Sequence, residues 1–285
     1  MGSTSTKAIY VSAALSLIIG LVGCSSPRQE TQAIVPDGQA PEVEAAEEVV
    51  VEDEFDEHLL IQSYFDAVDQ SKPQDIIQGR EFAAEGSNAD KYAIEQAAFA
   101  QAELDAGDLD IVESHFTLYG DEGFMCPIEL ADLSRIEMQD AVLAGECVSY
   151  SGFQFEGGKL SNFNAGTSSL DGRIEVGDGT ALAIGDWGRV QHLASYVTMI
   201  GDLIVVFEVS SMTDGLQMPW DATLLLDNGR VMESSYTIGV SELDADRITN
   251  IAFLFQAADL GGKVEMVFTD DDWNEKEMAI PLVAD

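Results

Sequence analysis

The spacing of apolar residues changes once along this chain of 285 residues, and that change restricts the fold more than any other property of the sequence. Before about residue 105, apolar side chains recur every three or four positions, which is the period of one helix face. Beyond it they recur at every second position, as in Leu203, Val205 and Phe207, which is the period of a strand with one buried face. Helices followed by a run of strands predict an α+β region and then an all-β region.

The helical period predicts three helices, at 55–70, 74–84 and 89–104. Ser87 or Asn88 is the expected N-cap of the third helix, because both side chains accept a hydrogen bond from a free helix amide. Gly107 is its expected end. We place the α+β domain at 58–171.

The second domain is placed at 172–285. Its expected strands are 203–209, 223–226, 251–255, 264–268 and 278–283. Asp227-Asn228-Gly229-Arg230 is a strong hairpin turn, because Asn and Gly tolerate positive φ. About seven short strands in roughly 100 residues fit an immunoglobulin-like β-sandwich.

The N-terminus has the pattern of a secretory signal, with Lys7 followed by an apolar run that ends at Gly23. Leu21-Val22-Gly23-Cys24 resembles the lipobox of bacterial lipoproteins. That resemblance implies a signal peptide at 1–23, a lipid (palmitate-type acyl chains) on Cys24, and a location on the extracytoplasmic face of the cell membrane. An uncleaved anchor helix and N-myristoylation at Gly2 are the alternatives.

Residues 24–57 are predicted to be a disordered acidic tether. They hold eleven acidic residues and Arg28, and they lack a long apolar period. Such a segment buries too little surface to fold, and its like charges extend it. A spacer is the expected role, and a partner-binding or cation-binding arm is the alternative.

The remaining cysteines, Cys126 and Cys147, are an even pair in an exported protein, and we expect them to form a disulfide. Two buried thiols or a metal pair remain as alternatives. No CxxC motif or nearby His supports the metal pair.

The charge excludes some partners. With 52 acidic and 13 basic side chains the net charge is −39, so the chain has no basic face for nucleic acid or anionic lipid. His58, His115 and His192 are in no metal-ligand spacing, and no hydrolase, P-loop or dinucleotide motif is present. The sequence therefore predicts no enzyme, no metal and no cofactor.

Two further motifs are open to a binding interpretation. The run 270–275 begins like a calcium loop but has Glu275 where that loop needs Gly, so solvated loop charge is the simpler interpretation. Trp187, Trp220 and Trp273 lie near predicted turns, where they would pack at a core or rim, or stack on a sugar.

Two stretches carry a family resemblance. Gly86-Ser87 with Tyr92 and Gln96, followed by the run 153–163, resembles uncharacterised actinobacterial cell-envelope lipoproteins. That resemblance implies a helix-plus-curved-sheet domain of the cystatin or nuclear-transport-factor kind. The order of 203–209, 227–230 and 243–255 is similar to telokin-like, immunoglobulin-type domains of exported Gram-positive proteins, although Asp244-Ala245-Asp246 replaces the usual Gly.

Three functions follow as hypotheses. The first is a membrane-anchored, non-enzymatic interaction module of the cell envelope. The second is a small-ligand-binding protein that uses the concave face of the first domain, with His115, Phe116, Tyr150 and Phe153 as lining residues. The third is a hydrolase-type enzyme in that cavity, with His115 as its base.

Overall fold

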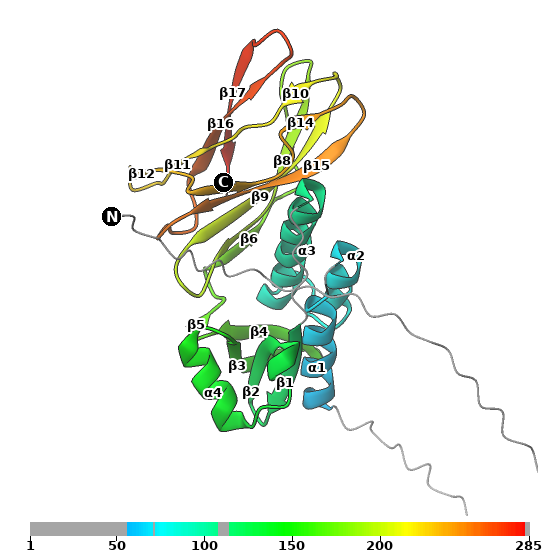
Figure 1. The fold of residues 1–285 in the computed structure, drawn as a ribbon, viewed down its shortest axis with the longest axis vertical. Coiled ribbons are helices and arrows are strands. Elements are labelled where there is room, and N and C mark those ends of the chain that lie inside the picture. Colours follow the sequence, from blue (N-terminus) through cyan, green and yellow to red (C-terminus); the bar gives the residue numbers. More distant parts are fainter. Residues whose placement is uncertain (1–55, 71, 108–113, 283–285) are drawn as a thin grey trace, which may run out of the picture. The chain divides into compact units, whose positions relative to one another are not determined.

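The computed structural model describes residues 56–70, 72–107 and 114–282 (Figure 1). The predicted signal peptide, Cys24 and nearly all of the predicted tether lie outside these ranges. Within them, no helix combines the length and apolarity that a membrane crossing requires. The helical elements are α1 (Glu57–Val68), α2 (Pro73–Ile76), the 3-10 helix η1 (Ile77–Glu81), α3 (Asn88–Ala106), the 3-10 helix η2 (Ile128–Leu130) and α4 (Arg135–Ala144).

The first and third predicted helices are confirmed. Ser87 caps α3, because its hydroxyl oxygen accepts a hydrogen bond from the Asp90 amide at 3.2 Å. Gly107 ends the helix with φ 73°, a left-handed conformation that glycine adopts at no steric cost. The predicted helix at 74–84 is shorter than expected, since α2 passes into η1 at Ile77.

Helix α4 was missed by the apolar spacing, because it buries Met138 and Ala141 and little else. A local signal was present in the sequence. Ser134 and Glu137 form a capping box, in which the Glu137 carboxylate accepts the Ser134 amide at 2.8 Å. A helix with a narrow buried face is better found from its cap than from its period.

The first sheet is antiparallel, with strand order β1-β2-β3-β4-β5. Its strands are β1 (Ser114–Tyr119), β2 (Glu122–Pro127), β3 (Val148–Glu156), β4 (Lys159–Ala165) and β5 (Ser168–Ser169). Helix α1 packs on β1 and β4, and its Tyr64 and Phe65 are fully buried. Helix α4 lies in the connection between β2 and β3.

The second region consists of two antiparallel sheets. One has the order β13-β15-β9-β8-β6, with β7 on β8, and the other has the order β12-β11-β16-β10-β14, with β17 on β16. The strands of the first sheet are β6 (Ile174–Val176), β7 (Ala181–Ala183), β8 (Gly188–Val197), β9 (Leu203–Ser211), β13 (Tyr236–Ile238) and β15 (Ile248–Phe255). Those of the second are β10 (Leu216–Gln217), β11 (Thr223–Leu225), β12 (Val231–Glu233), β14 (Glu242–Leu243), β16 (Lys263–Thr269) and β17 (Glu275–Pro281).

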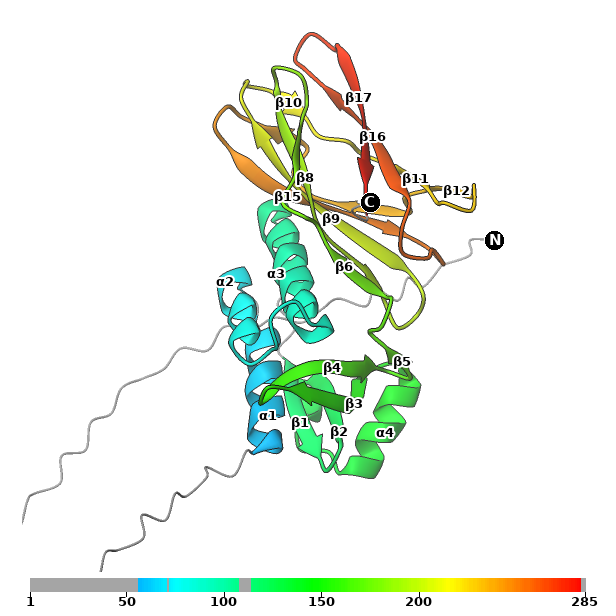
Figure 2. The ribbon, with the colours of Figure 1, turned by 180° about the vertical axis from the view of Figure 1, so that it is seen from behind.

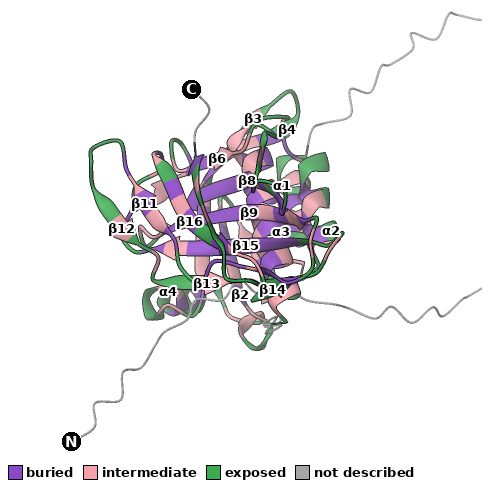
Figure 3. Ribbon diagram, turned by 90° about the horizontal axis from the view of Figure 1, so that it is seen from above, coloured by how far each residue is buried: buried purple, intermediate pink, exposed green. Residues whose placement is uncertain are grey.

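One apolar core joins these two sheets. Alternate residues of β9, such as Val205 and Phe207, meet Val264 and Phe268 of β16 in that core. The central strands β8, β9 and β15 are largely buried (Figure 3). The layout is consistent with the helix-then-strand order that the apolar spacing predicted, except for η2 and α4, which lie between β2 and β3.

Helix α3 packs on the other face of the β13-β15-β9-β8-β6 sheet (Figure 2). Ala98 and Ala102 of the helix meet Val206 and Ala252 of the sheet in a second apolar cluster, where the small side chains allow close approach. Residues before and after position 171 lie in one compact unit. The division of the chain at that position stays a prediction.

Candidate interaction surface

The predicted ligand face of the first sheet is filled by the protein's own side chains. Phe65 of α1 stacks on Phe116 with ring centroids 4.4 Å apart, and it lies 4.6 Å from Tyr150 and 6.0 Å from Phe153. Phe116 and Tyr150 are buried core residues. The concave-face hypothesis is therefore wrong for these aromatic residues, because α1 covers the face that a ligand would need.

His115 does not join them. It alternates with Phe116 on β1, so its side chain projects from the opposite face, and it is exposed. The hypothesis of a base in an aromatic cavity fails at this residue for the same geometric reason.

A different histidine forms the hydrogen bond that catalysis by a Ser–His pair would use. His192 Nε2 lies 2.8 Å from the Ser195 hydroxyl oxygen. A register shift in β8 between His192 and Ala194 brings these two side chains together. Ser195 is 0% exposed, so its hydroxyl is a buried partner of the imidazole.

The described surface includes a cleft and a groove. A cleft of about 100 Å³ borders His192, Asp178 and Ile280. A wider, shallow groove of about 500 Å³ is lined by residues that include Arg173, Met199 and Asp259. The Arg173 guanidinium there already donates to the Thr198 carbonyl. Neither hollow is lined by a ligand residue predicted from the sequence.

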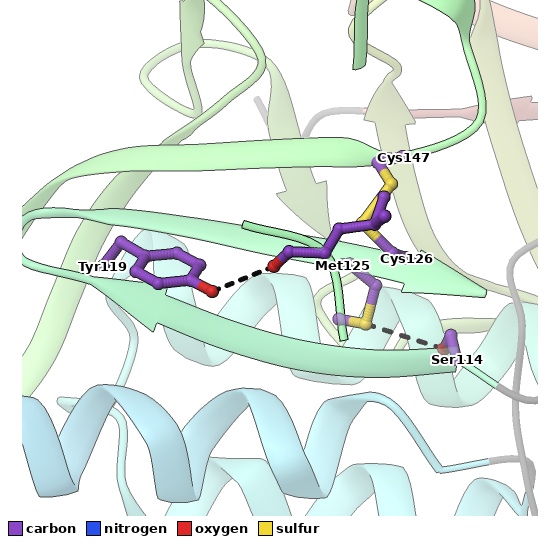
Figure 4. The surroundings of a disulfide bond; sticks show 6 residues. Ser114, Tyr119, Met125, Cys126 and Cys147 are labelled. Atoms are coloured by element: carbon purple, nitrogen blue, oxygen red, sulfur yellow. Dashed lines mark hydrogen bonds between the residues drawn. A yellow bond between two sulfur atoms is a disulfide. The ribbon is translucent and has the colours of Figure 1, made fainter. Parts of the chain in front are cut away.

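The predicted disulfide is present. Cys126 at the end of β2 and Cys147 just before β3 are joined (Figure 4). Both are buried in one apolar cluster with Met138 and Phe124. The Tyr119 hydroxyl donates to the Leu133 carbonyl at 3.0 Å. The covalent bond and this hydrogen bond both hold the segment that contains α4 against the first sheet.

Four connections of the two-sheet region meet at one end of it (top of Figure 1), and we call them the loop surface. They are the turn 184–187, the loop 212–215, the turn 244–247 and the turn 270–274. The loop 212–215 touches each of the other three.

Hydrogen bonds fix this arrangement. The Met212 amide donates to the Trp187 carbonyl at 2.7 Å, and the Ala245 amide donates to the Asp214 carboxylate at 3.1 Å. Gly215 lies so close to the Asp271 carboxylate that a Cβ atom would collide with it.

The loop surface combines exposed apolar side chains with acidic ones. Trp273 is 82% exposed and Met212 is 61% exposed. Trp187, by contrast, is mostly buried and lies under Lys276, whose ammonium is 4.4 Å from the indole centroid and 3.1 Å from Asp186. The exposed acidic residues are Asp186, Asp214, Asp244, Asp246, Asp271 and Asp272.

Hydrogen bonds within the turn that carries Trp273 hold its backbone in place. Trp273 has φ 62°, and its amide donates to the Asp270 carbonyl at 2.9 Å. The Asp270 carboxylate accepts from the amides of Asp272 and Asn274 and from the Asn274 side chain. These bonds, first of all the one from the Asn274 side chain, lower the pKa of Asp270.

Those hydrogen bonds explain the polar residues of the run 270–275 as parts of a turn, without the calcium-loop interpretation. Over the described ranges, no group of three or more His, Cys, Asp or Glu side chains is arranged to hold a metal ion. The sequence pointed to Trp273 only as a tryptophan near a turn. It contained no signal that the loop carrying Met212 lies beside the turn carrying Trp273, because 61 positions separate these two residues.

Comparison with known proteins assigns no family. No protein-family model matches the chain, and no curated protein matches it. Among solved structures, the yeast GGA1 GAE domain is similar to 37% of this chain and to 98% of its own length, with 15% identity and a TM-score of 0.26. A likeness of this size assigns neither a fold family nor a function.

Proposed function

We propose that this protein is a lipid-anchored, extracytoplasmic, non-enzymatic interaction module that binds a protein partner through the loop surface. The observation that carries the proposal is Trp273, an 82% exposed indole on a hydrogen-bonded turn, with exposed Met212 on the adjoining loop. Tryptophan and methionine are enriched in protein interfaces, and an ordered side chain loses little entropy on binding.

The charge of the loop surface defines the partner's chemistry. The loop surface exposes six carboxylates and Arg247, so its charge is mainly negative and a partner with a basic rim and an apolar centre fits. Opposite charges steer the encounter, whereas burial of the indole supplies most of the affinity.

We also propose that the two-sheet region is an immunoglobulin-like sandwich of the telokin-like kind, and that the first region is a cystatin-like or nuclear-transport-factor-like cone. One core shared by two antiparallel sheets supports the first assignment. Helix α1 packed on a five-stranded antiparallel sheet supports the second. Membership in a group of actinobacterial envelope lipoproteins is a proposal that rests on the sequence resemblance.

Site-specific photo-crosslinking tests the interaction function. A photoreactive amino acid replaces Trp273 in the full-length protein in its native cells, and a matched variant carries it at Trp220, which is 76% exposed but lies outside the loop surface. We expect a discrete covalent adduct from position 273 and none of that size from position 220. Equal adducts at both positions, or none at 273, would contradict the proposal.

A separate experiment tests the anchor. Cys24→Ala removes the only predicted acylation site, so the protein should move to the soluble fraction and lose incorporation of labelled palmitate. Continued membrane association of Cys24→Ala without detergent would contradict lipid anchoring and leave the interaction function to its own test.

A further inference from the structure

Helix α3 connects the two regions of the chain. Tyr92 and Ala93 belong to the core of the first region, whereas Ala98 and Ala102 pack on the sheet of the second. Near its C-terminus, the Asp105 carboxylate accepts the Asn250 amide at 2.8 Å and the Thr249 hydroxyl at 2.9 Å. The Asn250 side-chain amide donates to the Ala98 carbonyl at 3.0 Å.

Glu95 lies in the middle of this helix and is 0% exposed. One carboxyl oxygen accepts a hydrogen bond from the Gln96 side chain at 2.7 Å. The other, Oε1, is buried and has no hydrogen-bond partner within the described part of the chain. A charged carboxylate in this position would lack the compensation that buried charges need.

No element within the described ranges is shown to supply a cation to Glu95. Tyr92 on α3 and Tyr196 on β8 interact electrostatically with Glu95. Both are neutral at physiological pH, because burial raises their pKa. Lys91, one turn earlier on α3, is paired with Glu175 of β6 at 3.1 Å.

Five further charged groups lie on the helix or on elements around it. They are Arg173, which approaches Tyr196 and bonds the Thr198 carbonyl, the Arg80–Asp90 pair at the start of α3, Asp105 near its end, and Glu208 of β9. Arg173 and Arg80 are each bound to another partner, and the remaining groups are acidic. None of these groups therefore compensates a negative charge on Glu95, and desolvation by burial is what disfavours that charge.

We propose that protonation of Glu95 controls the docking of α3 on the β13-β15-β9-β8-β6 sheet, so that the helix is held when this carboxyl is neutral and released when it ionises. The buried position and the unpartnered oxygen carry the inference. The pKa supports it, because desolvation raises the pKa of Glu95 from its ordinary value of 4.5 to about 8, and the Gln96 hydrogen bond only partly opposes the shift.

The sign of the effect follows from proton binding. Between pH 4.5 and about 8, the docked helix keeps the proton and the released helix loses it. The opening equilibrium should then rise up to about tenfold per pH unit in that window, and it should level off above pH 8. Because Asp105 holds the start of β15 beside the turn 244–247, release of the helix would also loosen one edge of the loop surface.

Hydrogen exchange of the full-length protein, corrected for intrinsic rates, tests the proposal between pH 5.5 and 9. Wild-type protein should lose protection of the amides of 95–106 with rising pH, while the amides of β9 keep theirs. Glu95→Gln should abolish that pH dependence. Glu103→Gln, which removes a partly exposed carboxylate from the same helix, should leave it as in the wild type.

The wild-type measurement stands by itself if Glu95→Gln does not fold. Asp69, directly after α1, titrates in the same window, because burial raises its pKa to about 7, but opening around it would be reported by α1 amides. Equal pH dependence in α3 and β9, flat protection of α3 across the window, or an unchanged slope in Glu95→Gln would overturn the proposal. None of these outcomes depends on whether the loop surface binds a partner.

Discussion

His192 Nε2 and the Ser195 hydroxyl oxygen lie 2.8 Å apart on the inner side of β8, although regular alternation would place residues three positions apart on opposite faces of a strand. The register shift between His192 and Ala194 removes that conflict. The imidazole also packs on Phe207, with ring centroids 5.7 Å apart. The hydrogen bond between His192 and Ser195 lies within one strand, and it places a titratable imidazole in the core of the protein.

The buried imidazole predicts a loss of stability in acid. Desolvation lowers the pKa of His192 from 6.5 to about 4, so the unfolded chain binds more protons than the folded chain between these values. The stabilisation is fully present above pH 6.5 and is lost as the pH falls toward 4, by up to about 3 kcal/mol. Urea unfolding of wild type and His192→Gln at pH 7 and pH 4.2 measures it. His115→Gln, which changes an exposed histidine, should behave as wild type, and an equal acid loss in His192→Gln would refute the assignment.

Phe65 is expected to be the most sensitive side chain of the first core. Its ring contacts Phe116, Tyr150 and Phe163 and is 0% exposed. Phe65→Ala should lower the free energy of unfolding by about 3–5 kcal/mol, because it removes the side chain and leaves a cavity. Leu143→Ala, at an 86% exposed position on α4, should change it by less than about 0.5 kcal/mol. A loss below about 1 kcal/mol for Phe65→Ala would mean that α1 does not fill the concave face in solution.

The disulfide between Cys126 and Cys147, 21 positions apart, should stabilise the fold by about 3 kcal/mol through loop closure in the unfolded chain. Denaturant unfolding of the Cys126→Ala, Cys147→Ala double variant measures this, with the reduced wild type as a second route to the same loss. Two free thiols in non-reducing mass spectrometry of the native protein would exclude the bond.

The order of the turn that carries Trp273 should depend on Asp270, the first of its three consecutive aspartates. Asp270→Ala removes the acceptor for the amides of Asp272 and Asn274, so the backbone of Trp273 should become mobile on the nanosecond timescale. Asp272→Ala removes the same charge from an exposed neighbour and should leave the turn ordered. Heteronuclear NOE values of the Trp273 amide distinguish the two, and equal values in both variants would show that charge alone determines the turn.

The sequence by itself determined much of the local structure. Helical spacing located α1 and α3, and Ser87 and Gly107 marked both ends of α3, because capping is decided by neighbouring backbone groups. Alternation along β9 separated the core-facing Val205 and Phe207 from Val206. An even number of remaining cysteines was enough to predict the disulfide.

Only the tertiary structure decided which surfaces are free. Phe116 and Tyr150 alternate on strands as a ligand face would, and nothing local shows that Phe65, some fifty or more positions earlier, covers them. The loops that carry Met212 and Trp273 lie beside each other for the opposite reason, because two sheets bring distant loops to one end. Local patterns report what each residue does to its own backbone and face. Whether a residue is buried depends on which element packs against it, and only the tertiary structure determines that element.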